Sequence, residues 1–171
     1  EICACLVGSE MCIRDSRTQI YKYLNFEQTY ADACFTAHAI EPDNENAPKD
    51  EAEIEAYYNE IRKIWDGRDI TIIRGEGTEI FQHDIYDNAK SVNYIYGPKA
   101  HAFRDYDRLL AEAKAQPKDR LMIVVLGPTA TVLAYDLAKA GYQALDIGHL
   151  GKAYDWLKRK ETIVIGKFFA S

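Results

Sequence analysis

The chain has 171 residues, a net charge of −6 at pH 7 and 47% hydrophobic residues, which suits one globular domain. Its mildly acidic balance argues against a nucleic-acid partner, whose electrostatic footprint would be basic. No apolar run approaches the roughly 20 residues needed to cross a bilayer, so we expect no membrane span.

The first sixteen residues differ in character from the rest. Residues 6–16, LVGSEMCIRDS, resemble the translation of a transposase sequencing adapter. We therefore expect residues 1–16 to be a non-native scar, the alternative being a genuine strand, and residues 17–171 to form a single domain without its natural N-terminus. Three of the four cysteines fall in the scar, and Cys34 alone cannot form an internal disulfide, which predicts a cytoplasmic protein.

Apolar periodicity predicts the elements in chain order. Residues 17–39 are weakly helical, residues 40–49 form a loop, and residues 50–65 form an amphipathic helix. One face of that helix carries Ile54, Tyr57, Tyr58, Ile61 and Trp65. Strands are predicted at residues 69–74, 92–96, 121–126 and 142–147, with helices at 84–90 and 102–114, a helix between the last two strands, a short helix at 154–158 and an extended tail at 162–169.

Two of these helices have predicted inner faces. The helix at 102–114 should direct Phe103, Tyr106, Leu109 and Leu110 inward. The helix between the last two strands should be capped by Thr129, pack through Val132, Leu133, Leu137 and Ala140, and end at Gly141.

The alternation of strands and helices predicts an α/β class: a Rossmann-like, doubly wound, mainly parallel sheet flanked by helices. Ligands bind such sheets beyond the carboxyl ends of the strands. We therefore expect three turns to converge on one site, at residues 75–78, 127–131 and 146–149.

Several side chains and backbone groups at these turns are candidates for chemistry. Gly75 and Gly77 permit close approach of a ligand, or form an ordinary tight turn. The amides that follow Gly127 and Pro128 suit a phosphate or a sugar. The candidate general bases are Glu76, Asp84, Asp87, Asp146 and Asp155.

Among these bases Asp146 is well placed because it ends a buried strand, although it can instead cap the next turn. His149 either binds phosphate, acts as a base or fills the turn. Asn88 either bonds to a sugar or uracil or lies on a helix surface.

Five segments of the chain, GRDITIIRGEG, DIYDNAKSVNYIYGP, AFRDYD, LGPTATVLAYDLAKAGYQALDIGH and YDW, resemble the GT-D-type glycosyltransferases. The resemblance covers about residues 67–156. It implies a Rossmann-like domain that binds a UDP-sugar, typically UDP-glucose, and transfers glucose to a glycan or glycoprotein. A non-catalytic nucleotide-sugar or glycan-binding module is the alternative. An unrelated enzyme that uses NAD or S-adenosylmethionine is disfavoured because the turn lacks the dinucleotide fingerprint.

The family typically carries an Asp-x-Glu motif after Gly-His, associated with Mn or Mg. This chain has Gly151, Lys152 and Ala153 there, which leaves the metal and its ligands undetermined, and Lys152 is either a substitute for part of the metal's charge or a surface lysine. The family's first turn usually holds an arginine, which residues 78–84 lack.

We expect Asp146, His149 and Asp155 to serve catalysis. We expect the donor to be bound by Gly75, Glu76, Gly77, Asp84, Asp87, Asn88, Gly127, Pro128, Thr129, Ala130 and Lys152.

Overall fold

The computed structural model describes residue 27 and residues 50–78 and 84–159. The scar predicted for residues 1–16, the loop at 40–49, the tail at 162–169 and all but one residue of the helix at 17–39 lie outside these residues. Within the described part, no helix is both long and apolar enough to cross a membrane.

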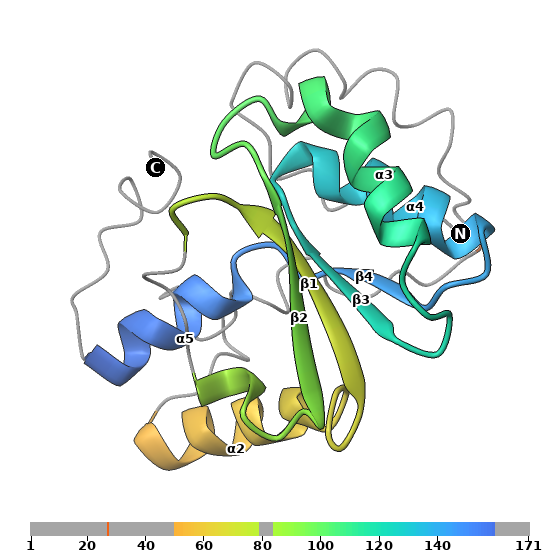
Figure 1. Ribbon diagram of the computed structural model, residues 1–171. Coiled ribbons are helices and arrows are strands. Elements are labelled where there is room, and N and C mark those ends of the chain that lie inside the picture. The colour runs from red at the N-terminus through yellow and green to blue at the C-terminus, as the bar shows by residue number, and fades with distance from the viewer. Residues whose placement is uncertain (1–26, 28–49, 79–83, 160–171) are drawn as a thin grey trace.

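A parallel sheet of four strands, in the order β2-β1-β3-β4, forms the centre of the domain (Figure 1). The strands are β1 (Asp69–Gly75), β2 (Ser91–Gly97), β3 (Leu121–Val125) and β4 (Ala144–Asp146). β1 and β3 are almost wholly buried, which explains the continuous apolar sequence of β3 and the three isoleucines of β1. The predicted strands are therefore present in one parallel sheet.

Helices cover both faces of the sheet, which confirms the predicted doubly wound α/β fold (Figure 1). One face is covered by α3 (Tyr106–Lys114) and α4 (Pro128–Lys139). The other is covered by α2 (Glu51–Arg62), the short 3-10 helix η3 (Asp84–Tyr86) and α5 (Leu150–Arg159).

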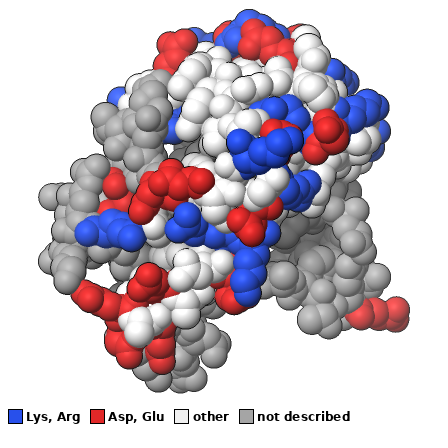
Figure 2. All heavy atoms as spheres, turned by 60° about the horizontal axis from the view of Figure 1, so that its bottom comes forward, with Lys and Arg blue, Asp and Glu red and all other residues white. Residues whose placement is uncertain are grey.

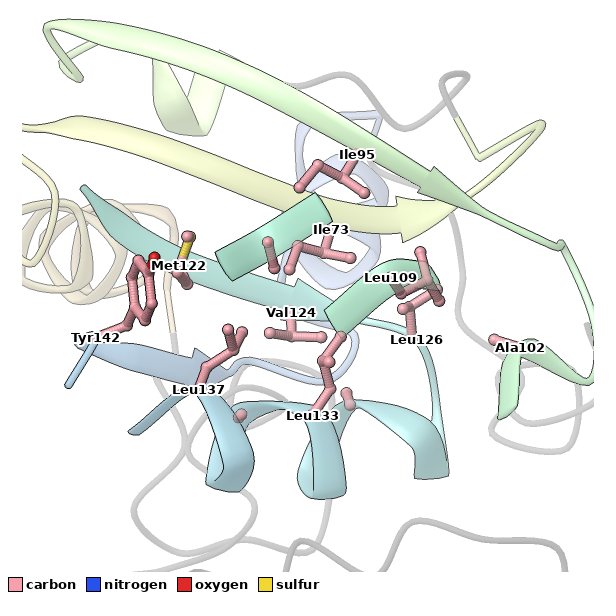
Figure 3. Packing of buried hydrophobic residues seen from close by; sticks show 13 residues of the cluster. Ile73, Ile95, Ala102, Leu109, Met122, Val124, Leu126, Leu133, Leu137 and Tyr142 are labelled. Carbon is pink, nitrogen blue, oxygen red and sulfur yellow. The ribbon is translucent and has the colours of Figure 1, made fainter. Parts of the chain in front are cut away.

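The core on the α3 and α4 side is close-packed and entirely apolar at its centre (Figure 3). Ile73 and Val124 of the sheet meet Leu109 of α3 and Leu133 and Leu137 of α4. Each of these five side chains is fully buried, so this layer fixes α4, and with it the turn that precedes α4, against the sheet.

The core on the opposite side joins α2, η3 and α5. Tyr58, Ile61 and Trp65 are buried there, as the helical pattern predicted, and Asp50 caps α2 by accepting a hydrogen bond from the Glu53 amide at 2.9 Å. The fully buried Trp65 also donates from Nε1 to the Ile85 carbonyl at 2.9 Å. These contacts hold α2 and η3 together beneath the sheet.

The helix predicted at 102–114 is divided in two. Residues 102–105 form the 3-10 helix η4 (Ala102–Asp105), and α3 begins at Tyr106. Because a 3-10 helix turns more tightly than an α-helix, the inward position falls on Ala102 and not on Phe103. Phe103 is 59% exposed and stacks on Tyr106 with ring centroids 5.0 Å apart, so its predicted inward direction was wrong.

The amino end of α4 also differs from the prediction. Gly127 is the N-cap, with φ 55°, and Pro128 occupies the first turn, so Thr129 lies inside the helix and is not its cap. Val132 is 42% exposed because the buried stripe of α4 passes through Ala130, Leu133, Ala134 and Leu137.

The carboxyl end of α4 explains why β4 is shorter than predicted. Gly141, with φ 88°, follows the last helical turn as expected, and its amide donates to the Ala138 carbonyl. The Tyr142 amide donates to the Leu137 carbonyl, which completes a Schellman motif. Since this bond uses the Tyr142 N–H, pairing with β3 begins later, at Ala144.

Two further helices have other lengths than predicted. The segment at 84–90 contains η3 alone, followed by turns, and the helix predicted at 154–158 already begins at Leu150. The earlier start follows from Gly148, whose φ of 51° reverses the chain directly after β4. Gly151, Lys152 and Ala153 therefore lie in the first turns of a helix.

Candidate functional site at the carboxyl edge of the sheet

Parallel strands bring their carboxyl ends to one edge of the sheet. We use the term carboxyl edge for the turns that follow the four strands, at residues 75–78, 98–101, 126–131 and 147–149. The chain runs from β1 to β2 on one side, then returns past β1 to β3 on the other. The crevice between β1 and β3 is therefore the point where strand order reverses, the usual ligand position in open α/β sheets.

The turn after β1 is built against the end of β2. The Glu76 amide donates to the Gly97 carbonyl at 2.8 Å, and a Cβ added to Gly75 would lie 3.3 Å from the Lys99 Cα. Gly77 has φ 74°, a conformation that favours glycine. Glu76 and Gly77 are exposed, so this turn presents backbone and a carboxylate to solvent, and their contact to a ligand stays a prediction.

Arg74, the last side chain before this turn, is a candidate that sequence reasoning missed. It is 6% exposed, and its Nε donates to Thr78 Oγ1 at 2.8 Å, while its Cζ lies 5.9 Å from the centre of the Tyr94 ring. Among the described residues no carboxylate pairs with Arg74, and its Nη1 and Nη2 atoms donate no hydrogen bond. The Nη1 and Nη2 atoms are not fully buried, so they can meet water or an anion at the surface.

A signal for Arg74 was present in the sequence. It is the single charged residue at the end of the apolar run from Ile70 and lies directly before Gly75. The sequence comparison looked for an arginine inside the turn, whereas the Arg74 side chain reaches Thr78 from the end of the strand.

The amino end of α4 follows β3 at the same edge. The Ala130 amide donates to the Gly127 carbonyl at 2.9 Å, so it is not available to a phosphate as predicted. Thr129 is 6% exposed, whereas Gly127 and Pro128 face solvent. A ligand that approaches this end of α4 would therefore meet Gly127 and Pro128 and not the Ala130 amide.

Asp146 joins two of the predicted turns. Its Oδ2 accepts from Thr131 Oγ1 at 2.8 Å, and its Oδ1 accepts from the Gly148 amide at 3.1 Å. Burial raises the pKa of Asp146 above its ordinary value, although both hydrogen bonds oppose the shift. Asp146 therefore caps the following turn and also holds that turn against α4.

His149 and Lys152 follow from this turn into α5. His149 directly precedes α5, and its carbonyl accepts from the Ala153 amide at 2.9 Å. Burial lowers the pKa of the half-buried His149 imidazole, and the Lys152 ammonium adds to the shift. Burial also lowers the pKa of Lys152, which lies in the first turn of α5. Asp155 lies one turn further along α5 and is 9% exposed.

Three predicted donor-binding residues lie in or directly after η3. Asn88 is near the amino end of β2, where its Nδ2 donates to the Arg62 carbonyl and to Asp66 Oδ1, each at 3.0 Å. Asp84 lies 3.7 Å from the Lys158 ammonium on the outside of α5, and Asp87 is exposed after η3. The structure does not bring Asn88 to the carboxyl edge, because its own side chain ties the turn after η3 to the end of α2.

The described residues offer few ligands for a divalent metal ion. Within residues 50–78 and 84–159, no group of three or more His, Cys, Asp or Glu side chains is arranged to hold a metal ion. Both oxygens of Asp146 already accept hydrogen bonds, and the Ala153 position, where the family has a carboxylate, is fully buried. Such ions prefer several oxygen ligands, so the described residues do not fit one here.

Comparison with known proteins identifies the family. A family model described as "Glycosyltransferase GT-D fold" matches residues 9–166, and the chain therefore belongs to the glycosyltransferases of the GT-D fold. The match begins inside residues 1–16, the segment predicted to be a scar. This segment lies outside the described residues, so the structure does not test the prediction.

Two curated relatives are streptococcal. The chain is 35% identical over 111 residues to "Glycosyltransferase GlyD" of Streptococcus pneumoniae, covering 64% of this chain and 14% of that protein. It is 33% identical over 103 residues to "Probable glycosyl transferase Gly" of Streptococcus gordonii, covering 60% of this chain and 15% of that protein. The chain thus matches a small part of much longer proteins.

Solved structures share the fold. One, described as "The highly conserved domain of unknown function 1792 has a distinct glycosyltransferase fold", aligns with a TM-score of 0.73 and 30% identity over 86% of this chain and 51% of that one. Another, "A New Glycosyltransferase (DUF1792) from Streptococcus sanguinis", has a TM-score of 0.70 and 24% identity over 94% of this chain and 62% of that one. The second likeness concerns the fold alone.

Proposed function

We propose that this chain transfers a sugar, glucose in the first instance, from a UDP-sugar to a glycan or glycoprotein acceptor. Family membership supports sugar transfer, and the observation that carries the proposal for the donor is Arg74. A buried guanidinium without a carboxylate partner among the described residues stands beside the crevice where open α/β sheets bind nucleotides. A cytoplasmic location stays a prediction that rests on Cys34.

The donor's diphosphate is the anion that this arrangement suits. When the bond between the sugar's anomeric carbon and the diphosphate oxygen breaks, negative charge grows on the diphosphate. An arginine binds two phosphate oxygens through parallel N–H donors, and Arg74 has Nη1 and Nη2 available for this. In a site screened from water, such a preorganised cation stabilises the leaving group strongly.

The acceptor hydroxyl must lose a proton as its oxygen bonds to the anomeric carbon. His149 suits this task because its lowered pKa leaves the imidazole neutral near pH 7 and able to accept a proton. Asp146 is already engaged by Thr131 and Gly148, so its part is to position the turn that carries His149. Asp155 and the exposed Glu76 remain as further candidate bases at this edge.

A non-catalytic module that binds a nucleotide sugar or a glycan is the second candidate. It is favoured by one observation: Gly151 and Ala153 stand where the family has carboxylates, and Ala153 is fully buried in α5. Such a module keeps the donor-binding crevice but does not turn the donor over.

The two candidates differ in turnover. The purified chain is incubated with UDP-glucose, UDP-galactose, UDP-N-acetylglucosamine and GDP-mannose, with and without glycopeptide acceptors, and the released nucleoside diphosphate is measured. Thermal shift with each compound, and with NAD and S-adenosylmethionine, reports binding separately. Release of UDP supports the transferase, and stabilisation without release supports the module. A shift with NAD or S-adenosylmethionine but with no sugar nucleotide would contradict both.

A further inference from the structure

The guanidinium group of Arg74 is held on two sides by neighbouring side chains. Its Nε donates to Thr78 Oγ1 at 2.8 Å, which fixes the group within its own plane. Its Cζ lies 5.9 Å from the centre of the Tyr94 ring, so the ring supports one face of the cation. The edge that carries Nη1 and Nη2 donates no hydrogen bond to the described residues, and neither atom is fully buried. The guanidinium is therefore held so that this edge can meet a ligand.

The Thr78 hydroxyl is itself oriented by the turn after β1. It donates its proton to the Gly75 carbonyl at 2.5 Å, so toward Arg74 it acts as an acceptor only. The Thr78 amide bonds to the same carbonyl at 3.4 Å, and Gly77, with φ 74°, allows the turn that brings these groups together. The Glu76 amide ties the turn to a carbonyl at the end of β2 at 2.8 Å. Thr78 thus has a fixed place beside the guanidinium.

The Tyr94 ring is supported as well. In the parallel pairing of β1 with β2, Ile72 lies opposite Tyr94 and Arg74 lies opposite Tyr96, so these side chains share one face of the sheet. The Tyr94 and Tyr96 rings stack with centroids 5.8 Å apart and planes inclined by 13°. The two rings and the cation therefore form one packed group at the carboxyl end of β1 and β2.

A fixed arginine is a better ligand for a diphosphate than a mobile one. A mobile side chain loses conformational freedom when it binds, whereas the contacts to Thr78 and Tyr94 restrict Arg74 before a ligand arrives. With Nε engaged, Nη1 and Nη2 remain as donors for two oxygens of a phosphate group. The position of the guanidinium, and not its charge alone, should therefore contribute to donor affinity.

We propose that Thr78 and Tyr94 are positioning residues of the donor site: they hold the Arg74 guanidinium so that Nη1 and Nη2 bind oxygens of the donor's diphosphate, and they do not contact the donor themselves. The inference rests on the proposed function, since it assigns how the same donor site is built. It requires that both residues act through Arg74. Removing either one should weaken the binding of phosphate groups but not of the nucleoside, and only while Arg74 is present.

Calorimetric titration tests the proposal with UDP, pyrophosphate and uridine as probes, each in EDTA and in manganese chloride. Thr78→Val removes the hydroxyl and keeps the shape of the side chain. UDP and pyrophosphate should then bind roughly 3- to 10-fold more weakly, the range for one hydrogen bond, and uridine should bind as it does to the wild type. Thr78→Ser keeps the hydroxyl and should restore the affinity. Tyr94→Leu, which removes the ring beside the cation, should weaken UDP binding by a similar factor, whereas Tyr94→Phe, which keeps the ring, should not.

A double-mutant cycle separates positioning from direct contact. Thr78→Val is combined with Arg74→Met, and UDP affinity is measured for the wild type, the two single variants and the double variant. Because Thr78 acts through Arg74 in this proposal, the loss caused by Thr78→Val should disappear in the Arg74→Met background. Urea denaturation checks that each variant is folded, and Thr78→Ala takes the place of Thr78→Val in the cycle if the valine variant is unfolded.

The other outcomes overturn the inference. An equal loss in both backgrounds shows that Thr78 acts on the donor without Arg74, and an equal loss for UDP and uridine shows that Thr78 only shapes the turn. Unchanged UDP affinity in Thr78→Val or in Tyr94→Leu shows that Arg74 needs no such support. These outcomes leave the proposed donor in place, whereas absence of UDP binding by the wild type in both media overturns the proposed donor and this inference together.

Discussion

Two buried arginines lie at opposite ends of the same sheet and differ in their hydrogen bonding. Arg120, at the amino end of β3, is 9% exposed and donates from Nε to Thr71 Oγ1 at 3.0 Å, from Nη1 to Ser91 Oγ at 3.1 Å, and from Nη2 to the Ile70 carbonyl. Arg74, at the carboxyl end of β1, is 6% exposed and, among the described residues, donates from Nε alone. The two side chains are almost equally buried. Among the described residues, however, Arg120 donates three hydrogen bonds and Arg74 donates one.

The residues around the two arginines differ in the same way. Beside Arg120, Asp69 pairs with Lys90 at 2.8 Å and accepts from Ser91 at 2.6 Å. Over much of the face that comes forward in Figure 2, acidic and basic side chains lie close together. At the carboxyl edge Arg74 has a hydroxyl and an aromatic ring as neighbours. The amino end is thus a completed structural network, whereas Arg74 at the carboxyl edge has no carboxylate partner among the described residues.

The largest effect on stability is expected at Arg120. Arg120→Met removes the donors to Thr71 and Ile70 in the buried sheet, and we expect the free energy of unfolding to fall by roughly 2–4 kcal/mol. Urea denaturation measures the change. Arg104→Met, at an exposed arginine of η4, is the control and should leave the free energy almost unchanged. A variant Arg120→Met as stable as the wild type would show that this network contributes nothing.

The same substitution at Arg74 should have the reverse signature. Arg74→Met loses one hydrogen bond to Thr78 but also removes a buried charge, so the free energy of unfolding should change by less than about 1 kcal/mol. UDP affinity should fall roughly 10- to 100-fold, as measured by calorimetric titration. If Arg74→Met unfolds readily and the surviving protein binds UDP normally, the two arginines have the same structural role.

A smaller, pH-dependent effect is expected at Asp146. Because burial raises its pKa in the folded protein above the unfolded value, the folded state holds this proton more tightly. The contribution of Asp146 to stability is therefore greatest at low pH and declines as pH rises through the folded pKa. Asp146→Asn cannot ionise and keeps an acceptor for Thr131 or Gly148, so the variant should gain stability relative to the wild type as pH rises from about 4 to 7. Urea denaturation across this range measures the difference, and a relative loss with rising pH would contradict the assignment.

The core of the fold was predictable because it follows from local patterns. A continuous apolar run located β3, and the spacing of Tyr58 and Ile61 identified the inner face of α2. The errors arose at helix starts, where a shift of one or two residues, or a 3-10 turn in place of an α-helical turn, changes which side chains face the core. Phe103 turned outward in a 3-10 helix, and Pro128 moved the start of α4 ahead of Thr129.

The candidate site was predictable in position but not in detail. The turns at residues 75–78 and 146–149 were located from glycines at strand ends, and the fold brings both to one edge. The tie between Thr131 and Asp146 joins residues far apart in the sequence, so no local pattern reveals it. Arg74 was missed because it became a candidate only through its burial and its lack of a carboxylate partner among the described residues. Both are properties of the folded structure that the sequence does not reveal.

The central claim, that the carboxyl edge is the donor site and the amino end is structural, is tested most directly by nuclear magnetic resonance. UDP is titrated into 15N-labelled protein, and the amide shifts of the two ends of the sheet are compared. We predict saturable changes at residues 74–78, 126–131 and 147–152, and none at residues 68–70, 90–91 and 119–121. Saturable binding that perturbs the amino end and leaves the carboxyl edge unchanged would contradict the account.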